Sequence, residues 1–139
     1  MNNTLDRVAV LMSTRSSFCR RISQGIGTYA RPFKPWLVRI ASNEPERLSE
    51  IESWRPTGMI IHCGSKDLYP AVRQLGCPVV NVSRGLKDSE FLTVGIDDCE
   101  VGQLAAKHLI DRGFKNLAFC GDMTRAYAID RGDGFREQC

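Results

Sequence analysis

The stretch from Leu92 to Asp122, LTVGIDDCEVGQLAAKHLIDRGFKNLAFCGD, constrains the fold more than any other part of the chain. Alternating apolar residues in Leu92–Ile96 predict a short strand, and the acidic pair that follows offers oxygen acceptors to the free N–H groups of a helix start. Apolar residues at helical spacing predict one buried helix face, made of Val101, Leu104, Ala105, His108 and Leu109. Gly113 predicts the helix stop, and Leu117–Phe119 predicts a second, buried parallel strand. The stretch therefore indicates a strand–helix–strand unit.

The rest of the chain repeats this alternation of strand and helix. Apolar runs predict further strands at Arg7–Ser13, Trp36–Ala41, Gly58–Cys63 and Pro78–Ser83, with helices between them. Asn43 is expected to cap the second helix, and Gly76 to end the third. The predicted fold is α/β, a doubly wound parallel sheet of about five strands with helices on both faces. No repeat or linker divides the 139 residues, so we expect a single domain.

Charge and cysteine usage exclude several classes of protein. The net charge is +3, and the basic residues are scattered among acids rather than clustered as on a DNA-binding face. No apolar stretch of about 20 residues predicts a membrane span, and the absence of a secretory leader favours the cytoplasm. The six cysteines form no C-x-x-C pair and accompany no cluster of histidines. We therefore expect free thiols, no metal site and no cofactor.

Right-handed crossovers place every turn after a strand at the same edge of a parallel sheet. The turns expected there are Thr14–Ser17, Cys63–Ser65, Ser83–Arg84, Asp97–Asp98 and Gly121–Thr124. Their hydroxyl, guanidinium and carboxylate groups, with the ring of Phe18 nearby, suit a polyhydroxylated molecule such as a sugar. One acid of the pair Asp97–Asp98 is expected to cap the helix, which leaves only the other to face a ligand.

Nothing in the sequence predicts an enzyme. There is no G-x-S-x-G motif and no P-loop, and neither histidine is placed as the base of a nucleophile. His108 belongs to the predicted inward face of a helix, and His62 lies within a strand next to the edge. A flavodoxin-like or receiver-like domain that binds a nucleotide or phosphate is the alternative, although a receiver has clustered acids after its first strand and Ser13–Arg15 has none.

The pattern VGIDDCEVGQLAAKHLIDRGFKNLAFCG, followed by DRGDGF at Asp130–Phe135, resembles the sensor domain of the lactose/galactose-repressor superfamily, which is related to periplasmic sugar-binding proteins. The resemblance extends over almost the whole chain from Arg7 and is greatest to bacterial xylose-operon regulators. In those proteins an AraC-type helix-turn-helix domain follows the sensor. The resemblance implies that this chain is the N-terminal lobe of a sugar sensor, with the second lobe and the DNA-binding domain in further sequence. It also implies a homodimer whose effector is xylose or another pentose.

The resemblance also implies which residues contact the effector. They are Thr14, Arg15 and Phe18 after the first strand, Cys63, Gly64 and Ser65 after the third, and Ser83 and Arg84 after the fourth. The pair Asp97–Asp98 matches the acidic turn of the family. Arg131 matches an arginine that either holds the effector or stabilises the crossing between lobes. Asp122 stands where the family usually has Gly-Pro or Gly-Leu-Pro, so this turn departs from the pattern.

Overall fold

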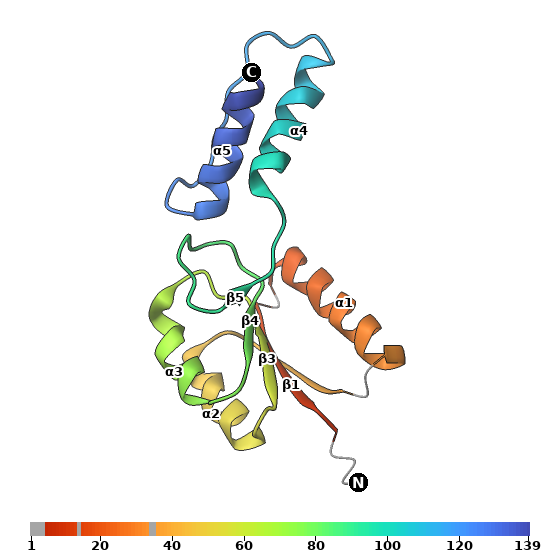
Figure 1. Ribbon diagram of the computed structural model, residues 1–139, viewed down its shortest axis with the longest axis vertical. Coiled ribbons are helices and arrows are strands. Elements are labelled where there is room, and N and C mark those ends of the chain that lie inside the picture. The colour runs from red at the N-terminus through yellow and green to blue at the C-terminus, as the bar shows by residue number, and fades with distance from the viewer. Residues whose placement is uncertain (1–4, 14, 34–35) are drawn as a thin grey trace. The chain divides into compact units, whose positions relative to one another are not determined.

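The computed structural model describes residues 5–13, 15–33 and 36–139 (Figure 1). Its elements are β1 (Arg7–Leu11), α1 (Ser17–Phe33), β2 (Leu37–Ala41), α2 (Pro45–Trp54), β3 (Gly58–Ile61), the 3-10 helix η1 (Lys66–Leu68), α3 (Tyr69–Gln74), β4 (Val79–Asn81), β5 (Leu92–Thr93), α4 (Asp98–Ile110) and α5 (Ala126–Gln138). Where the sequence indicated no internal boundary, the chain divides into two compact units. The sheet unit comprises the residues up to Ser83 together with Ser89–Val94, and the helical unit comprises Arg84–Asp88 and Gly95–Cys139.

The sheet unit is built on five parallel strands in the order β2-β1-β3-β4-β5. Val10 of β1 lies level with Ile40 of β2 and with Ile60 of β3. An interior strand covered on both faces must be apolar throughout, and Val8–Leu11 is accordingly buried without a break. The predicted α/β fold with a parallel sheet is confirmed. Other doubly wound proteins share this strand order, so the order alone does not select a function.

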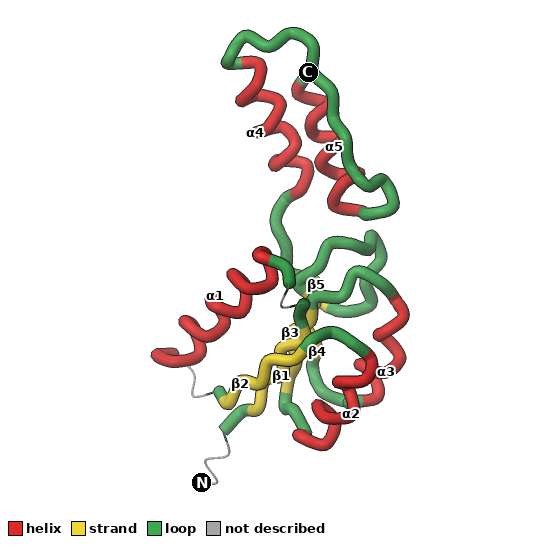
Figure 2. Tube along the Cα trace, turned by 180° about the vertical axis from the view of Figure 1, so that it is seen from behind, coloured by secondary structure: helices red, strands yellow, loops and turns green. Residues whose placement is uncertain are grey.

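Helices cover both faces of this sheet. The helix α1 lies on one side, and α2 and α3 lie on the other (Figure 1, Figure 2). The core beneath α1 consists of Val8, Val10, Met12 and Cys19, with Ile22, Ile26, Trp36, Val38 and Ile60 packed against them. The intervening strand positions Ala9 and Leu11 point to the opposite face, where α2 buries Leu48 and Ile51.

Local signals at the helix ends were predicted with mixed success. Gly76 (φ 64°) and Gly113 (φ 83°) both adopt the left-handed conformation after their helices, as predicted. The prediction of Asn43 as a helix cap is wrong. Glu44 occupies the N-cap of α2 without a side-chain bond, because the Asn43 amide instead donates to the carbonyl oxygen of His62 at 3.0 Å.

In the helical unit, α4 and α5 approach each other through glycines. A Cβ atom on Gly102 would lie 2.0 Å from the carbonyl oxygen of Arg131, and one on Gly134 would lie 2.0 Å from the carbonyl oxygen of Cys99. Only glycine permits backbones to come this close. The two glycines therefore fix the distance between the helices.

This contact overturns the predicted inner face of α4. The buried residues of α4 are Asp98, Gly102 and Ala106, which lie on one face because each is four positions after the last. The residues predicted to be inward, Val101, Leu104, Ala105 and His108, are exposed, and only Leu109 is half-buried. The prediction failed because α4 meets a helix through small residues, rather than a sheet through large ones.

Two predicted strands also differ from the structure. The strand predicted over Leu92–Ile96 pairs only at Leu92 and Thr93, because the sheet unit ends at Val94. The run Leu117–Phe119, predicted as a buried strand, forms no strand. A strand needs a neighbouring strand to accept its backbone hydrogen bonds, and the described part of the helical unit offers none.

Candidate functional site

The carboxyl ends of β1, β3 and β4 meet at one edge of the sheet unit because these strands are parallel neighbours. We call the residues that follow them the carboxyl edge: Ser13 and Arg15–Phe18, His62–Ser65, and Val82–Ser83. Of the predicted contact residues, Arg15, Phe18, Cys63, Gly64, Ser65 and Ser83 belong to this edge. The predicted residue Thr14 lies outside the described residues. Ligands of open parallel sheets bind at such edges.

An aromatic pair stands at the carboxyl edge. Phe18 at the start of α1 and His62 after β3 pack edge to face, with ring centroids 5.7 Å apart and planes inclined by 63°. The Phe18 side chain remains 48% exposed, so one part of its ring faces solvent. Burial lowers the pKa of His62, which keeps the imidazole neutral at pH 7. The pair therefore offers an uncharged, partly apolar surface at an otherwise polar edge.

Asn81, which sequence reasoning missed, holds two of the predicted contact segments together. Its side chain is fully buried at the end of β4. The Oδ1 atom accepts hydrogen bonds from the backbone nitrogens of Cys63 at 3.1 Å and Ser83 at 3.0 Å, and Nδ2 donates to the Cys63 carbonyl at 3.1 Å. The signal available in the sequence was a single amide inside the apolar run PVVNVS.

The segment Cys63–Ser65 is ordered by its own side chains as well. Ser65 caps the short helix η1, where its hydroxyl accepts from the backbone nitrogen of Asp67 at 3.2 Å. The Cys63 thiol donates to the Ser65 carbonyl oxygen at 2.8 Å, and burial raises the pKa of this thiol. A protonated, hydrogen-bonded thiol is a poor nucleophile. This geometry suits binding by a rigid loop and does not activate Cys63 for chemistry.

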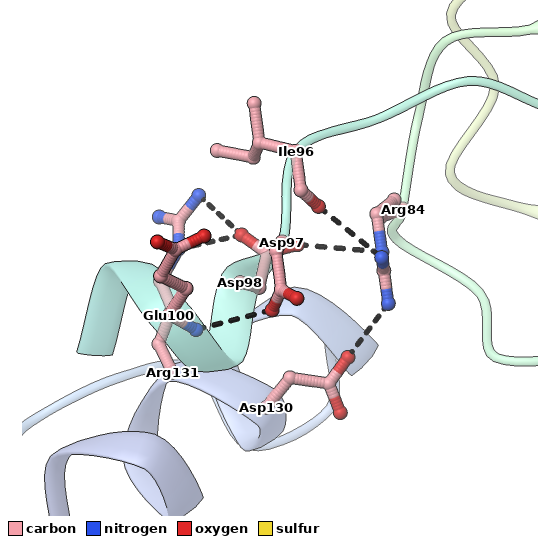
Figure 3. Close-up of polar contacts among 7 residues, drawn as sticks. All are labelled: Arg84, Ile96, Asp97, Asp98, Glu100, Asp130 and Arg131. Carbon is pink, nitrogen blue, oxygen red and sulfur yellow. Dashed lines mark hydrogen bonds and ion pairs between the residues drawn. The ribbon is translucent and has the colours of Figure 1, made fainter. Parts of the chain in front are cut away.

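In the helical unit, Asp97 and Asp98 have different roles, and the predicted helix cap is confirmed for one of them (Figure 3). Asp97 is the N-cap of α4 and accepts from the backbone nitrogen of Glu100 at 3.1 Å, as expected for one of the pair. Asp98 is only 1% exposed and is not free. Its Oδ1 atom accepts from Nε of Arg131 at 2.8 Å and from Nη2 at 2.7 Å, and Nε of Arg84 lies 3.4 Å from its Oδ2 atom.

The two arginines are held by further partners in the same unit, as Figure 3 shows for Arg84. Arg84 pairs through Nη2 with Asp130 at 3.0 Å and donates through Nη1 to the carbonyl of Ile96 at 3.2 Å. The Arg131 guanidinium lies over the Tyr127 ring, 5.2 Å from its centroid. Asp130 and Tyr127 were not singled out from the sequence, although Asp130 stands in the DRGDGF motif. The cluster balances two positive and two negative charges, which suits it to hold its arginines in place.

Asp122 orders the turn before α5. Its Oδ1 atom accepts from the backbone nitrogen of Thr124 at 3.0 Å and from the Thr124 hydroxyl at 2.6 Å. These hydrogen bonds, with Arg125 nearby, lower the pKa of Asp122. The turn at which the sequence departs from the family pattern is thus held by hydrogen bonds between Asp122 and Thr124.

Two other features are absent from the described residues, a metal-binding cluster and a membrane span. Among the described residues, no three His, Cys, Asp or Glu side chains gather in a way that could hold a metal ion. Of the helices in the same ranges, none combines the length and the apolar character needed to cross a bilayer.

Comparison with known proteins then identifies the family. Residues 6–139 match the family of periplasmic binding proteins and the sugar binding domain of the LacI family. This chain belongs to that family.

Individual members of the family are distant from the chain. The xylose operon regulatory protein of Escherichia coli (strain K12) is 22% identical over 139 residues, which cover 94% of this chain and 36% of that protein. The transcription regulator CcpA of Lactococcus lactis superposes with a TM-score of 0.79 at 21% identity, over 97% of this chain and 53% of the other. A LacI family transcriptional regulator from Enterococcus faecium, solved with bound ribose, gives a TM-score of 0.74 at 20% identity, over 96% and 51%. The chain thus spans about a third of its curated relative and about half of the solved chains.

Proposed function

We propose that this chain is the effector-sensing part of a sugar-responsive transcription regulator, and that the carboxyl edge of its sheet unit contacts the sugar. The observation that carries the proposal is the half-exposed ring of Phe18 at an edge where Asn81 fixes the backbone of Cys63 and Ser83, in a chain of a sugar-binding family. We propose binding rather than catalysis, because burial raises the pKa of the Cys63 thiol, which donates a hydrogen bond to the Ser65 carbonyl oxygen, and a protonated thiol is a poor nucleophile.

The chemistry of the edge matches that of a sugar ring. The apolar C–H face of a sugar packs on an aromatic ring, which Phe18 provides. Sugar hydroxyls both donate and accept, and they require partners of both kinds that do not move. Ser83 and the segment Cys63–Ser65 supply such groups, and the exposed guanidinium of Arg15 can donate to two neighbouring hydroxyls.

Residues of the helical unit are proposed to take part through their arginines. Arg84 and Arg131 remain 41% and 36% exposed although they bind Asp98, so each retains N–H groups for a ligand. Asp98 then acts by orienting these two groups, and Asp97 acts as a helix cap. Asp122 is exposed, but Thr124 engages its Oδ1 atom and Nε of Arg125 lies 3.6 Å from its Oδ2 atom, so we propose that it orders the turn before α5.

The division into two units suggests a different boundary for the first lobe from the one that the sequence suggested. The sequence suggested that residues 1–139 are all part of the first lobe. We infer instead that the sheet unit is the first lobe and that the helical unit begins the second. The apolar run Leu117–Phe119 and the exposed stripe with Val101 and Leu104 support this inference, because a further parallel sheet would pair the first and cover the second.

Xylose or another pentose is the proposed effector. Two distant relatives support this proposal, one named for the xylose operon and one solved with ribose. The regulator is proposed to act in the cytoplasm as a homodimer that contacts DNA through a domain outside this chain. A sugar that binds one conformation of the sensor more tightly shifts the population of conformations, and with it the spacing of the two DNA-binding domains.

Isothermal titration calorimetry tests the proposal on the full-length protein with D-xylose, ribose, arabinose, glucose and galactose. Saturable heat with a pentose is expected. Phe18→Ala should weaken binding about tenfold or more because it removes the stacking surface. Tyr29→Ala is the matched control, since Tyr29 lies in the same helix and is 49% exposed against 48% for Phe18. Absence of heat with every sugar refutes the sugar assignment, and equal losses for both variants refute the role of the carboxyl edge.

A further inference from the structure

We propose that Asn81 is a positioning residue for effector binding: it holds the two contact segments Cys63–Ser65 and Ser83 in register without touching the sugar itself. The inference rests on the proposed function of the carboxyl edge. Asn81 is fully buried, so the side chain acts through the groups it binds.

All four hydrogen-bonding positions of the Asn81 amide are used. Oδ1 accepts from the backbone nitrogens of Cys63 and Ser83, and Nδ2 donates to the Cys63 carbonyl and, at 3.4 Å, to the hydroxyl of Tyr69. An amide has two acceptor and two donor positions, so the side chain of Asn81 can satisfy all four contacts at once. One side chain thus connects the turn after β3, the turn after β4 and the start of α3.

The network extends through Tyr69 to the segment before β5. The Tyr69 hydroxyl lies 3.1 Å from the Ser89 hydroxyl, and its ring packs against Phe91 with centroids 4.7 Å apart. Ser89 and Phe91 belong to the stretch that leads into β5. The contact segments are therefore joined to the last strand of the sheet unit by a chain of hydrogen bonds, and not only by the sheet itself.

The decisive variant is Asn81→Asp, because its behaviour depends on protonation. An ionised carboxylate only accepts, so it places a buried charge against the Cys63 carbonyl oxygen. A protonated carboxyl donates once and accepts at its other oxygen, as the amide does. Burial raises the pKa of such a carboxyl, so the protonated form is accessible in mildly acidic solution.

We expect Asn81→Asp to weaken sugar binding at least tenfold at pH 7.5 and less than threefold at pH 5.5, each relative to wild type at the same pH. Two titratable residues contact Asn81, Cys63 through its backbone and Tyr69 through its hydroxyl, and burial raises the pKa of the Cys63 thiol. The ratio to wild type also cancels any effect of His62, which neighbours Cys63. Asn43→Asp is the matched control, since Asn43 donates a single bond at 3.0 Å to the His62 carbonyl and should change the affinity less than threefold at both pH values.

Three further measurements make each outcome decisive. Thermal unfolding of each variant separates a folding defect, which lowers Tm but leaves the Kd of the folded protein unchanged, from loss of positioning, which raises Kd. Amide exchange in Asn81→Leu should show faster exchange at Cys63 and Ser83. If Asn81→Asp does not fold at pH 7.5, Tyr69→Phe tests the same network with an expected loss of about threefold, worth roughly 0.7 kcal/mol.

The inference is overturned if Asn81→Asp binds sugar like wild type at pH 7.5, if its loss is the same at both pH values, or if the two amides keep their protection in Asn81→Leu. If wild type itself binds no sugar, the proposed function fails, whereas the exchange experiment still decides whether Asn81 orders the two segments.

Discussion

Replacing Gly102 with alanine tests the contact between α4 and α5, because one methyl group would occupy space taken by the neighbouring helix. The added Cβ atom would lie 2.0 Å from the carbonyl oxygen of Arg131 and 2.8 Å from the backbone nitrogen of Phe135. Real Cβ atoms essentially never approach other atoms within 3.0 Å. The obstacle is backbone, which cannot rotate aside as a side chain does, so the two helices must separate.

The magnitude follows from two opposing terms. Overpacking by one methyl group costs typically 1–3 kcal/mol, and a backbone obstacle places this site at about 3 kcal/mol. Alanine is better than glycine in a helix interior by about 1 kcal/mol, which offsets part of the cost. Gly102→Ala should therefore lower the free energy of unfolding of the helical unit by about 2 kcal/mol.

Gly25→Ala provides a control in which only the second term operates. Gly25 lies within α1, and an added Cβ there meets nothing within 4 Å. The same substitution should raise the free energy of unfolding of the sheet unit by about 1 kcal/mol. The two variants thus have opposite predicted signs, although both replace a helical glycine with alanine.

Urea denaturation followed by circular dichroism gives the free energy of unfolding, and hydrogen–deuterium exchange of peptides from α4 and α5 shows which unit is affected. Gly102→Ala should accelerate exchange in both helices and leave β1 and β3 unchanged. Stability equal to wild type, with unchanged protection of α4, would show that these helices do not meet at Gly102.

Further predictions concern charge, pH and the exposed face of α4. Asp98→Asn keeps the side-chain shape but leaves Arg131 without its carboxylate and Arg84 paired with Asp130 alone, and urea denaturation should show a loss of about 2 kcal/mol, less than for a fully enclosed pair because both arginines contact water. Burial lowers the pKa of His62, so the unfolded chain binds a proton at a higher pH than the folded chain, and stability should fall as the pH drops below about 6.5. Melting curves at pH 7.5 and 5.5 should show that His62→Phe lacks this part of the decrease. Leu104→Ala should cost less than about 0.5 kcal/mol in this chain, where Leu104 is 60% exposed, and about 2 kcal/mol or more in a longer polypeptide whose sheet covers it.

The sheet unit could be predicted from the sequence because each of its elements carries its own local signal. The unbroken apolar run at Val8–Leu11 indicates an interior parallel strand without knowledge of its neighbours. Gly76 has a positive φ, a condition that glycine satisfies at low cost in any context. The carboxyl edge follows from the parallel order, since topology alone places the ends of β1, β3 and β4 together.

The features that sequence reasoning missed depend on partners distant in the chain. Asp97 and Asp98 are adjacent and chemically identical, and nothing local indicates that the first caps a helix while the second binds Arg131, which is 33 positions away. Asn81 is a lone amide in an apolar run, and its importance appears only when Cys63, 18 positions earlier, is seen to use it as donor and acceptor. The roles of such polar groups are set by tertiary structure.

The sequence of α4 contains two separate patterns, and the prediction of its buried face used only the pattern of large apolar residues. Large apolar residues such as Val101 and Leu104 indicate packing on a sheet, whereas the small or polar residues Asp98, Gly102 and Ala106, four positions apart, indicate close approach of a second helix. Both can hold for one helix, because the two sets lie on different faces. In the structure, the face with Asp98, Gly102 and Ala106 packs against α5. The face with Val101 and Leu104 stays exposed, which is unfavourable because apolar surface contacts water. These two faces support our inference that α4 belongs to the first part of a second α/β lobe, whose sheet would cover the exposed face and pair the run Leu117–Phe119.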